Sequence, residues 1–175
     1  QVLCRSLSAG GQTPYEWLAR AVATPVSRVL DIGCGSGAMT EELAQPGRVV
    51  VGVDLSREEL LMAAQRSPGP WIRGNALHLP IADAACDAVV SVMGLAVIHP
   101  LARLLSEVTR VLRPGGVFAA LMPTTRPLQR ADFAVAGQIT RILRTTPRFP
   151  GALEPRLDAL FLAHYDGVYR LAYRL

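Results

Sequence analysis

Arg28-Val-Leu-Asp-Ile-Gly-Cys-Gly-Ser-Gly37 decides the fold of this 175-residue chain. The stretch begins as an apolar strand that carries a carboxylate, Asp31, and then runs into glycines at positions 33, 35 and 37. Because glycine has no Cβ, it can turn the chain sharply at positive φ and let an adenosine-sized ligand approach the peptide plane. We therefore expect a strand, a ligand-binding loop and the start of a helix here.

A second apolar run, from Arg48 to Asp54, also ends in a carboxylate. Asp54 lies 21 residues after Gly33. One helix needs this distance to bring a second carboxylate beside the first loop. It is also the spacing at which an acid binds a ribose in a doubly wound sheet.

Apolar patterning and capping residues predict the other elements as far as Pro123. Thr13, Pro14 and Glu16 predict the start of a helix, and Ser56 predicts the cap of another. Further helices are expected over 36–44 and 100–112, and strands over 28–32, 49–53, 71–73, 88–92 and 117–122. Strands that alternate with helices favour an α/β fold, a doubly wound and mostly parallel Rossmann-like sheet with helices on both faces. Arg113-Pro-Gly-Gly116 is expected to end the helix before the last of these strands.

The pattern weakens after Pro123. Helices fit 128–144 and 156–163, and a strand fits 168–174; alternatively, 160–165 pairs with 168–174 as a hairpin across Asp166-Gly167. The segment after Pro123 has room for only one convincing strand or a compressed hairpin. We therefore predict that the sheet is incomplete at its C-terminal edge or closed by a partner. An exposed edge strand can pair with a second chain, so the sequence also allows a homodimer.

Length and composition predict a single domain over residues 1–175, with a cofactor half over about 25–123 and acceptor-side segments over 1–24 and 124–175. The longest apolar run, 88–98, is too short to span a bilayer, and the first residues lack the pattern of a secretory signal. We therefore expect a cytoplasmic protein without a membrane partner. Three cysteines without a C-x-x-C pair argue against a disulfide framework and against a metal site.

The net charge of +4 lies in the last fifty residues, where eight Arg face four acids. Such a segment could bind nucleic acid. Its arginines lie at near-helical spacing without interleaved aromatic residues to stack bases, so a solvated helix face is the favoured interpretation. We therefore regard a nucleic-acid partner as the weaker hypothesis.

Three details separate the glycine loop from a nicotinamide dinucleotide site. The spacing is G-x-G-x-G, whereas a dinucleotide site has G-x-G-x-x-G. Asp31 would repel a pyrophosphate but would attract the ammonium group of an amino-acid ligand. After the strand at 71–73, Gly74-Asn75-Ala-Leu-His-Leu-Pro80 offers a short polar side chain and a backbone amide that could read a purine edge.

Five motifs in order resemble the signatures of class I S-adenosylmethionine-dependent methyltransferases, over about residues 25–123. The closest resemblance is to the small-molecule branch related to ubiquinone and menaquinone methylases. The motifs are Val29-Leu-Asp-Ile-Gly-Cys-Gly-Ser-Gly37, Gly52-Val-Asp-Leu-Ser56, Asn75-Ala-Leu-His-Leu-Pro80, Cys86-Asp-Ala-Val-Val and Leu112-Arg-Pro-Gly-Gly116.

The resemblance implies a cofactor, S-adenosylmethionine, with S-adenosylhomocysteine as its product, and it implies roles for the motif residues. Gly33, Gly35 and Gly37 would line the methionine part, with Asp31 near its ammonium group. Asp54 would take the ribose hydroxyls and Leu55 would lie against the adenine. Asn75 and the amide of Ala76 would read the adenine edge. Many relatives carry Asp where this chain has Asn75, but an Asn oxygen can still accept from the exocyclic amine, so we expect weaker binding.

The remaining site residues are less marked. Cys34 is expected as a small filler within the glycine loop, and Met93 and Leu95 as apolar walls of the cofactor or acceptor pocket. His99 is the best candidate for a catalytic base that takes a proton from an acidic acceptor. His78 is expected to line the cofactor pocket.

The favoured function is methyl transfer to a small-molecule acceptor through an O, N or C nucleophile. Alternatives are an RNA methyltransferase that uses the basic C-terminal segment and a non-catalytic S-adenosylmethionine-binding module.

Overall fold

A computed structural model describes residues 13–22, 26–123, 137–139, 141, 163–165 and 168–174. Its helices are α2 (Pro14–Ala21), α3 (Ala38–Leu43), α4 (Arg57–Arg66), α5 (Gly94–Val97) and α6 (Leu101–Val111). Its strands are β1 (Arg28–Ile32), β2 (Val49–Asp54), β3 (Trp71–Arg73), β4 (Cys86–Val92), β5 (Leu112–Pro123), β6 (Ala163–Tyr165) and β7 (Val168–Arg174).

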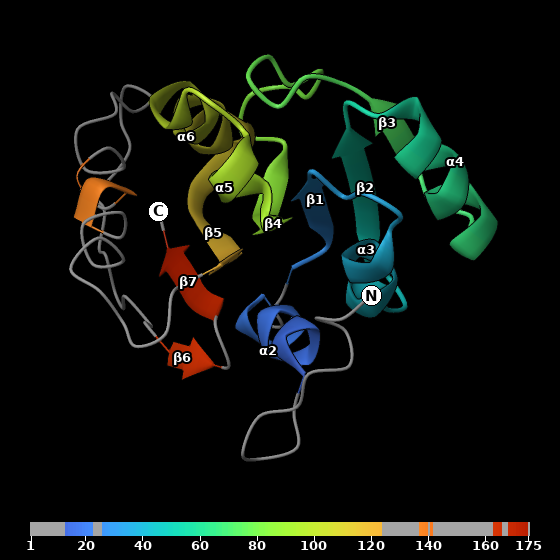
Figure 1. Ribbon diagram of the computed structural model, residues 1–175, viewed down its shortest axis with the longest axis horizontal. Helices are drawn as coiled ribbons and strands as arrows, with labels where there is room; N and C mark the ends of the chain where they lie inside the picture. The colour runs from blue at the N-terminus through green and yellow to red at the C-terminus, as the bar shows by residue number, and fades with distance from the viewer. Residues whose placement is uncertain are drawn as a thin grey trace.

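The strands form one sheet of seven in the order β3-β2-β1-β4-β5-β7-β6. Figure 1 shows this order from β3 at one side of the molecule to β6 at the other. The five strands from β1 to β5 are parallel, whereas β7 runs antiparallel to both β5 and β6. The predicted doubly wound α/β sheet is confirmed. The carboxyl ends of the five parallel strands therefore meet at one edge of the sheet, where ligands bind in such folds.

Local chemistry starts α2 and α4 where the sequence predicted. Thr13 and Glu16 form a capping box at α2, in which the Thr13 hydroxyl accepts from the Glu16 amide at 3.1 Å. The Ser56 hydroxyl caps α4 by accepting from the Glu59 amide at 3.2 Å.

The C-terminal edge of the sheet differs from the favoured prediction. β7 pairs with β5 from Val168 to Arg174, and β6 pairs with β7 as a hairpin. The hairpin alternative is therefore confirmed, and the prediction of an incomplete edge is wrong. β6 is three residues long and pairs with β7 only from Val168 to Arg170, so in the described part of the chain the rest of β7 pairs with β5 alone. The possible homodimer stays a prediction.

A helix was expected over 156–163, but Ala163, its last residue, is the first residue of β6. The rest of that expected helix, 156–162, lies outside the described residues. Residues 137–139 and 141 are helical, within the helix expected over 128–144.

β5 begins earlier than predicted. α6 ends at Val111, and Leu112 already pairs with Cys86, so Arg113-Pro-Gly-Gly116 belongs to the strand and does not precede it. The ladder between β4 and β5 shifts register between Cys86 and Ala88, and Gly115 has a φ of 76°. This bulge accommodates the extra residues that the turn motif adds to the strand.

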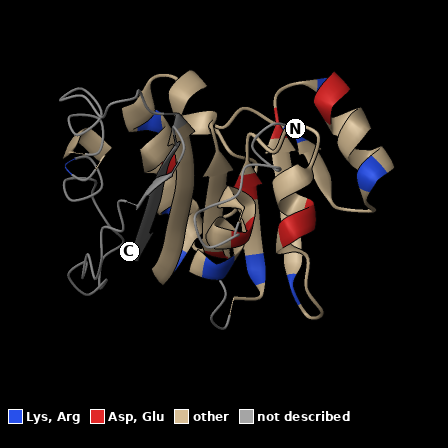
Figure 2. Ribbon diagram, turned by 60° about the horizontal axis from the view of Figure 1, so that its bottom comes forward, with Lys and Arg blue, Asp and Glu red and all other residues tan. Residues whose placement is uncertain are grey.

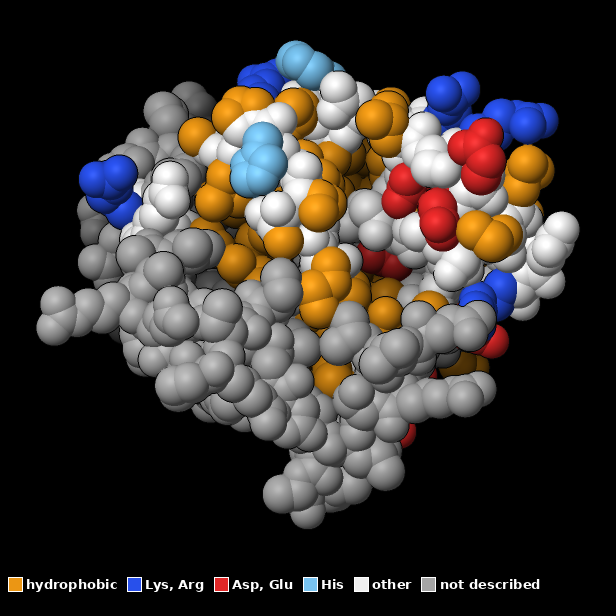
Figure 3. All heavy atoms as spheres, in the orientation of Figure 1, with side chains coloured by type: hydrophobic (Ala, Val, Ile, Leu, Met, Phe, Trp, Pro, Cys, Tyr) orange, Lys and Arg blue, Asp and Glu red, His pale blue; other side chains and the backbone are white. Residues whose placement is uncertain are grey.

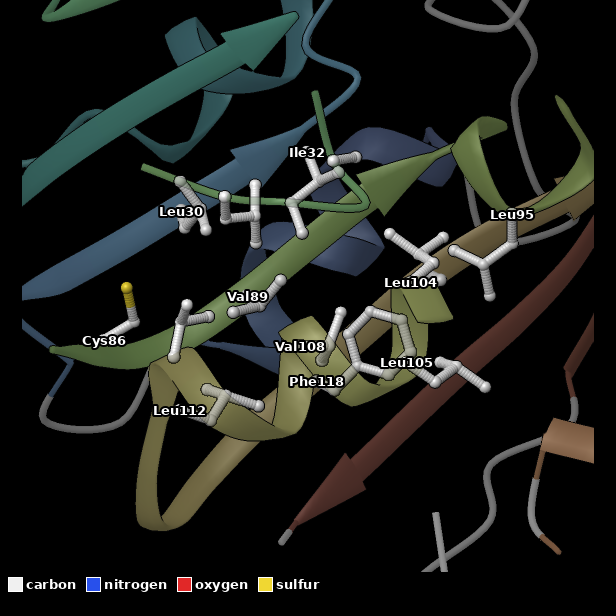
Figure 4. Packing of buried hydrophobic residues seen from close by; sticks show 14 of the residues in the cluster. Leu30, Ile32, Cys86, Val89, Leu95, Leu104, Leu105, Val108, Leu112 and Phe118 are labelled. Atoms are coloured by element: carbon white, nitrogen blue, oxygen red, sulfur yellow. The ribbon is translucent and has the colours of Figure 1, made fainter. Parts of the chain in front are cut away.

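Two hydrophobic clusters cover the two faces of the sheet. Alternate strand residues point to opposite faces, so Leu30 and Ile32 belong to one cluster and Val29 to the other. The first cluster packs the sheet against α6, and Figure 4 shows Phe118 and Val89 of this cluster beside Leu104, Leu105 and Val108. The second cluster packs the sheet against α2 and α3 through residues such as Leu18 and Leu43.

Basic residues do not gather on the described elements. Figure 2 shows them spread over several helices and strands, with acidic residues interspersed. Of the predicted helical arginines in the basic segment, Arg141 is described and exposed, whereas Arg126, Arg130, Arg144 and Arg148 lie outside the described residues. Within the described ranges, no helix combines the length and the apolar character that crossing a bilayer requires.

Candidate functional site

The glycine loop is held against the end of β2. All three glycines have positive φ, at 67°, 52° and 80° for Gly33, Gly35 and Gly37. The amides of Gly33 and Cys34 donate to the carbonyl of Val53 at 2.8 and 3.2 Å, and the Gly35 amide donates to Asp54 Oδ2 at 2.8 Å. The 21-residue spacing thus brings the second carboxylate beside the first loop, as predicted.

Asp54 also fixes the chain on its other side. Its Oδ1 accepts from the Ser56 amide at 2.9 Å, and its backbone carbonyl accepts from the Gly74 amide at 2.9 Å. Leu55, the next residue, is 65% exposed although it is large and apolar. An exposed leucine beside a half-buried carboxylate suits a ligand that has both a ring and hydroxyl groups.

Asp31 is fully buried in β1. Its Oδ2 accepts from the Thr40 hydroxyl at 2.7 Å, while its Oδ1 has no hydrogen-bond partner in the described part of the chain. Burial is the main cause that raises the pKa of Asp31 from 3.8 to about 7; the Thr40 hydrogen bond opposes this rise and the charge of Asp54 adds to it. A buried carboxylate oxygen without a partner is energetically costly unless a ligand satisfies it.

These observations fit the cofactor that the resemblance implied. An ammonium group supplies what the unpartnered Asp31 oxygen lacks, a charged donor. Gly33 and Gly35, both at positive φ and without a Cβ, leave space beside the loop for the rest of an amino acid. The residues present therefore fit S-adenosylmethionine.

Trp71, a residue that the sequence interpretation missed, packs beneath the glycine loop. A Cβ on Gly37 would lie 2.7 Å from Cη2 of the Trp71 ring, and a Cβ on Gly52 would lie 2.5 Å from Cζ3. Gly37 therefore also makes room for an indole ring within the protein. Cys34 is buried, as expected for a filler, and burial, followed by the charges of Asp31 and Asp54, raises the pKa of its thiol above its ordinary range. Cys34 therefore stays protonated at neutral pH.

The segment after β3 begins a turn at Asn75. The Asn75 side-chain oxygen accepts from the Leu77 amide at 2.9 Å, and its backbone oxygen accepts from the His78 amide at 2.9 Å. Asn75 is exposed, whereas Ala76 is 8% exposed and packs in the first cluster. The bond between Gly74 and Asp54 places this turn next to the end of β2. His78 is exposed, and Arg103 lies 3.0 Å from its Nδ1.

The residues that follow β4 separate into three environments. Met93 has a φ of 63°, which is unusual for a residue with a side chain, and it packs against the second cluster. Leu95 is 4% exposed and belongs to the first cluster, so it packs mainly in the core, and its role as a pocket wall stays a prediction. His99 is exposed between α5 and α6.

On the face seen in Figure 3, hydrophobic side chains line a hollowed central region, and acidic side chains gather on the wall at its right. No group of His, Cys, Asp and Glu side chains that could hold a metal ion occurs within the described ranges.

Two of the five motifs lie at the opposite end of the sheet. Asp87 accepts from the Ser27 amide at 3.0 Å, the Arg28 amide at 2.8 Å and Arg113 Nε at 2.6 Å. Burial would raise the pKa of Asp87, but these hydrogen bonds hold it well below its usual range. Asp87 and Arg113 thus join the amino ends of β1, β4 and β5 and have no place in the ligand site.

The sequence interpretation also missed Thr40 and three charged residues of α6. Thr40 lies nine residues after Asp31, on the first turns of the helix that follows the loop, and this spacing could have indicated it. Glu107 and Arg110 are three residues apart on a helix, a spacing that is also common in solvated pairs, so it carried no specific signal.

Known proteins resemble this chain over the same region. The profile of a family described as methyltransferase domain matches residues 30–120. A demethylmenaquinone methyltransferase of Beutenbergia cavernae is 38% identical over 106 residues, which are 60% of this chain and 44% of that protein. An uncharacterized methyltransferase of Synechocystis sp. is 38% identical over 130 residues, which are 70% of this chain and 59% of that protein.

The chain thus spans about half the length of these curated relatives. Among solved structures, the Haemonchus contortus phosphoethanolamine N-methyltransferase 2 in complex with S-adenosyl-L-methionine matches with a TM-score of 0.64 at 24% identity, over 78% of this chain and 37% of that one. This similarity shows the fold. Because the family profile covers more than half of the sequence and includes the glycine loop, Asp31, Asp54 and Asn75, the chain belongs to the S-adenosylmethionine-dependent methyltransferase domain family.

Proposed function

We propose that this chain transfers a methyl group from S-adenosylmethionine to a small-molecule acceptor. The observation that carries the proposal is the buried Asp31 carboxylate, whose Oδ1 has no described partner, directly before three glycines at positive φ. A dinucleotide would bring a pyrophosphate toward this carboxylate, and like charges repel. An amino-acid ammonium group is attracted to it instead.

Each site residue has a distinct task in this proposal. Asp31 would bind the ammonium group, and Gly33, Gly35 and Gly37 would lie along the methionine part, with Cys34 filling the space beneath. The residues on the nucleoside side would be Asp54 at the ribose, Leu55 on the adenine face, and Asn75 with the Ala76 amide at the adenine edge. Met93 would form an apolar wall. Asp54 already accepts from two backbone amides, so its carboxylate would bind the hydroxyls in a fixed orientation.

S-adenosylmethionine supplies a methyl carbon activated by the adjacent positive sulfur. The chain can therefore promote the reaction by aligning the two reactants and excluding water. If the acceptor is an acidic hydroxyl, His99 would take its proton, since it is exposed and follows the carboxyl end of β4.

The small-molecule assignment rests on the relatives. Their names include demethylmenaquinone methyltransferase and malonyl-[acyl-carrier protein] O-methyltransferase. The acceptor side would be formed by residues 1–24 and 124–175, most of which lie outside the described residues.

Isothermal titration with S-adenosylmethionine, S-adenosylhomocysteine and NAD tests the cofactor. We expect both adenosyl ligands to bind and NAD to give no heat. Asp54→Ala should weaken the binding of S-adenosylhomocysteine at least tenfold. The substitution removes the carboxylate that would bind the ribose hydroxyls and that also accepts from the Gly35 amide of the glycine loop. Glu42→Ala, which removes an exposed carboxylate from α3, is the matched control and should leave the affinity unchanged. Binding of NAD alone would refute the proposal.

Transfer of a labelled methyl group tests the acceptor. The protein is incubated with labelled S-adenosylmethionine and either a small-molecule extract or total RNA. Label in the small-molecule fraction supports the proposal, and label in RNA would replace it with an RNA methyltransferase. Tight cofactor binding without transfer to either pool would indicate a binding module.

A further inference from the structure

Three charged side chains of α6 hold the segment that follows β3. Arg103 Nε donates to the Leu77 carbonyl at 2.9 Å, and Arg110 donates to the carbonyls of Leu79 and Ile81 at 3.0 and 2.7 Å. Glu107 Oε2 accepts from the Leu79 amide at 2.7 Å. We call Arg103, Glu107 and Arg110 the α6 charged face.

The spacing on the two elements matches. Positions 103, 107 and 110 lie on one side of a helix, whereas the carbonyls of Leu77, Leu79 and Ile81 are those of alternate residues. One helix face can therefore reach three carbonyls at alternate positions of the segment. These contacts fix a stretch that has neither helix nor strand between Gly74 and Ala85.

Within the α6 charged face the charges compensate one another. Glu107 is 4% exposed and accepts from Arg110 at both of its oxygens, at 2.8 and 2.9 Å, and Arg103 Nη2 lies 3.8 Å from Glu107 Oε1. The Arg110 hydrogen bond, followed by the Leu79 amide bond, lowers the pKa of Glu107, so the side chain stays ionised at neutral pH despite its burial. A buried charge that is paired in this way has one preferred geometry, which the segment must follow.

The held stretch begins two residues after Asn75. The Leu77 amide donates to the Asn75 side chain, and the carbonyl of the same residue accepts from Arg103. Arg103 therefore acts on the turn that orients Asn75 and the Ala76 amide. The comparable ion pair between Arg113 and Asp87 lies at the other end of the sheet and has no such connection.

We propose that Arg103, Glu107 and Arg110 are positioning residues that set how the Asn75–Ala76 turn recognises the adenine 6-amino group. This inference rests on the proposed function, because that function places the adenine at the turn. The α6 charged face would not touch the cofactor. Through the turn, the α6 charged face would make the site bind adenine more tightly than a purine that has a carbonyl oxygen at position 6.

The test compares two ligands that differ at that position, S-adenosylhomocysteine and S-inosylhomocysteine, by isothermal titration. We expect the wild-type protein to prefer S-adenosylhomocysteine. Arg103→Ala should reduce this preference at least fivefold, with Arg103→Lys restoring part of it through one donor to Leu77. Arg103 is about half exposed, so its removal should leave the unfolding midpoint nearly unchanged.

Glu107→Gln and Arg113→Ala complete the experiment. Glu107→Gln should also reduce the preference, whereas Arg113→Ala should lower stability and leave the preference intact. Equal weakening of both ligands by Arg103→Ala and Glu107→Gln would show a merely structural role and overturn the inference, as would an unchanged preference. Failure of the wild-type protein to bind either ligand would refute the proposed function itself.

Discussion

Ionisation of Asp31 opposes folding. Its pKa is about 7 in the folded protein against an ordinary value of 3.8, so between these values the folded state retains a proton that the unfolded chain has lost. Stability therefore falls as pH rises through this range, by about 4 kcal/mol at the upper end. The protein keeps at this position a carboxylate that a ligand can use at the expense of stability, as ligand sites often do.

Asp31→Asn should accordingly stabilise the protein and weaken cofactor binding. At pH 8 the uncharged amide removes the burial penalty of the carboxylate, for an expected gain of about 2 kcal/mol, or roughly 4–8 °C in Tm. Affinity for S-adenosylhomocysteine should fall at least tenfold. In the wild-type protein that affinity should increase from pH 6 to pH 8, because the ionised form attracts the ammonium group.

Thermal unfolding and isothermal titration at both pH values check this prediction. Thr40→Val serves as the control. It removes the hydrogen bond to Asp31 and should lower stability without removing the carboxylate. A less stable Asp31→Asn variant with full affinity would contradict the assigned role.

Where neighbouring elements pack together, the indole ring of Trp71 leaves no room for a Cβ at three glycine positions. The ring of Trp71 on β3 fills the space that a Cβ would need at Gly37 before α3, at Gly52 on β2 and at Gly69 before β3. Its Nε1 donates to the Ser67 carbonyl at 3.2 Å, which fixes the ring at the end of α4. The glycine loop and the edge of the sheet are thus packed by the same side chain.

Gly52→Ala should destabilise the protein by about 2 kcal/mol, because its Cβ would lie 2.5 Å from the ring of Trp71 and 2.9 Å from Cys34 Sγ. The variant Trp71→Leu removes the ring and leaves the contact with Cys34, so adding Gly52→Ala to it should be less damaging than adding it to the wild-type protein. A urea-unfolding cycle of the four proteins should then give a coupling energy of about 1 kcal/mol or more. Gly137→Ala meets nothing within 4 Å and is the control without a clash. Simple additivity would contradict the packing argument.

Sequence predicted the elements that have strong local signals. β1 and β3 match their predicted bounds, and the Ser56 cap set the start of α4, because apolar runs and caps act within a few residues. The sequence did not distinguish β6 from the end of a helix, since three residues carry too little pattern.

In the site, the glycines and carboxylates could be predicted from their spacing. The α6 charged face could not be predicted, because its partners are backbone carbonyls 26 to 31 residues away in the sequence.

Across the whole molecule the two ends of the parallel strands have different tasks. The carboxyl ends carry the Asp31 oxygen that lacks a partner among the described residues, the strained Met93 backbone and the exposed Leu55. The amino ends carry Asp87, whose carboxylate is saturated with donors from Ser27, Arg28 and Arg113. Unsatisfied groups are typical of ligand sites, and satisfied networks are typical of structural ones.

Substitution at the amino end should therefore change stability alone. Asp87→Asn weakens charge-assisted bonds to two amides and two arginines, for an expected loss of about 3 kcal/mol at pH 7. Because the folded pKa of Asp87 is depressed, its contribution is fully present above the ordinary value of 3.8 and is lost progressively as pH falls from there through the folded pKa. The urea midpoints of wild type and Asp87→Asn should thus differ most at pH 7, and the difference should be smaller at pH 3 without vanishing. S-adenosylhomocysteine affinity, measured at pH 7 under native conditions, should be the same in both proteins. A weakened affinity in a folded Asp87→Asn variant would show that the two ends of the sheet are coupled.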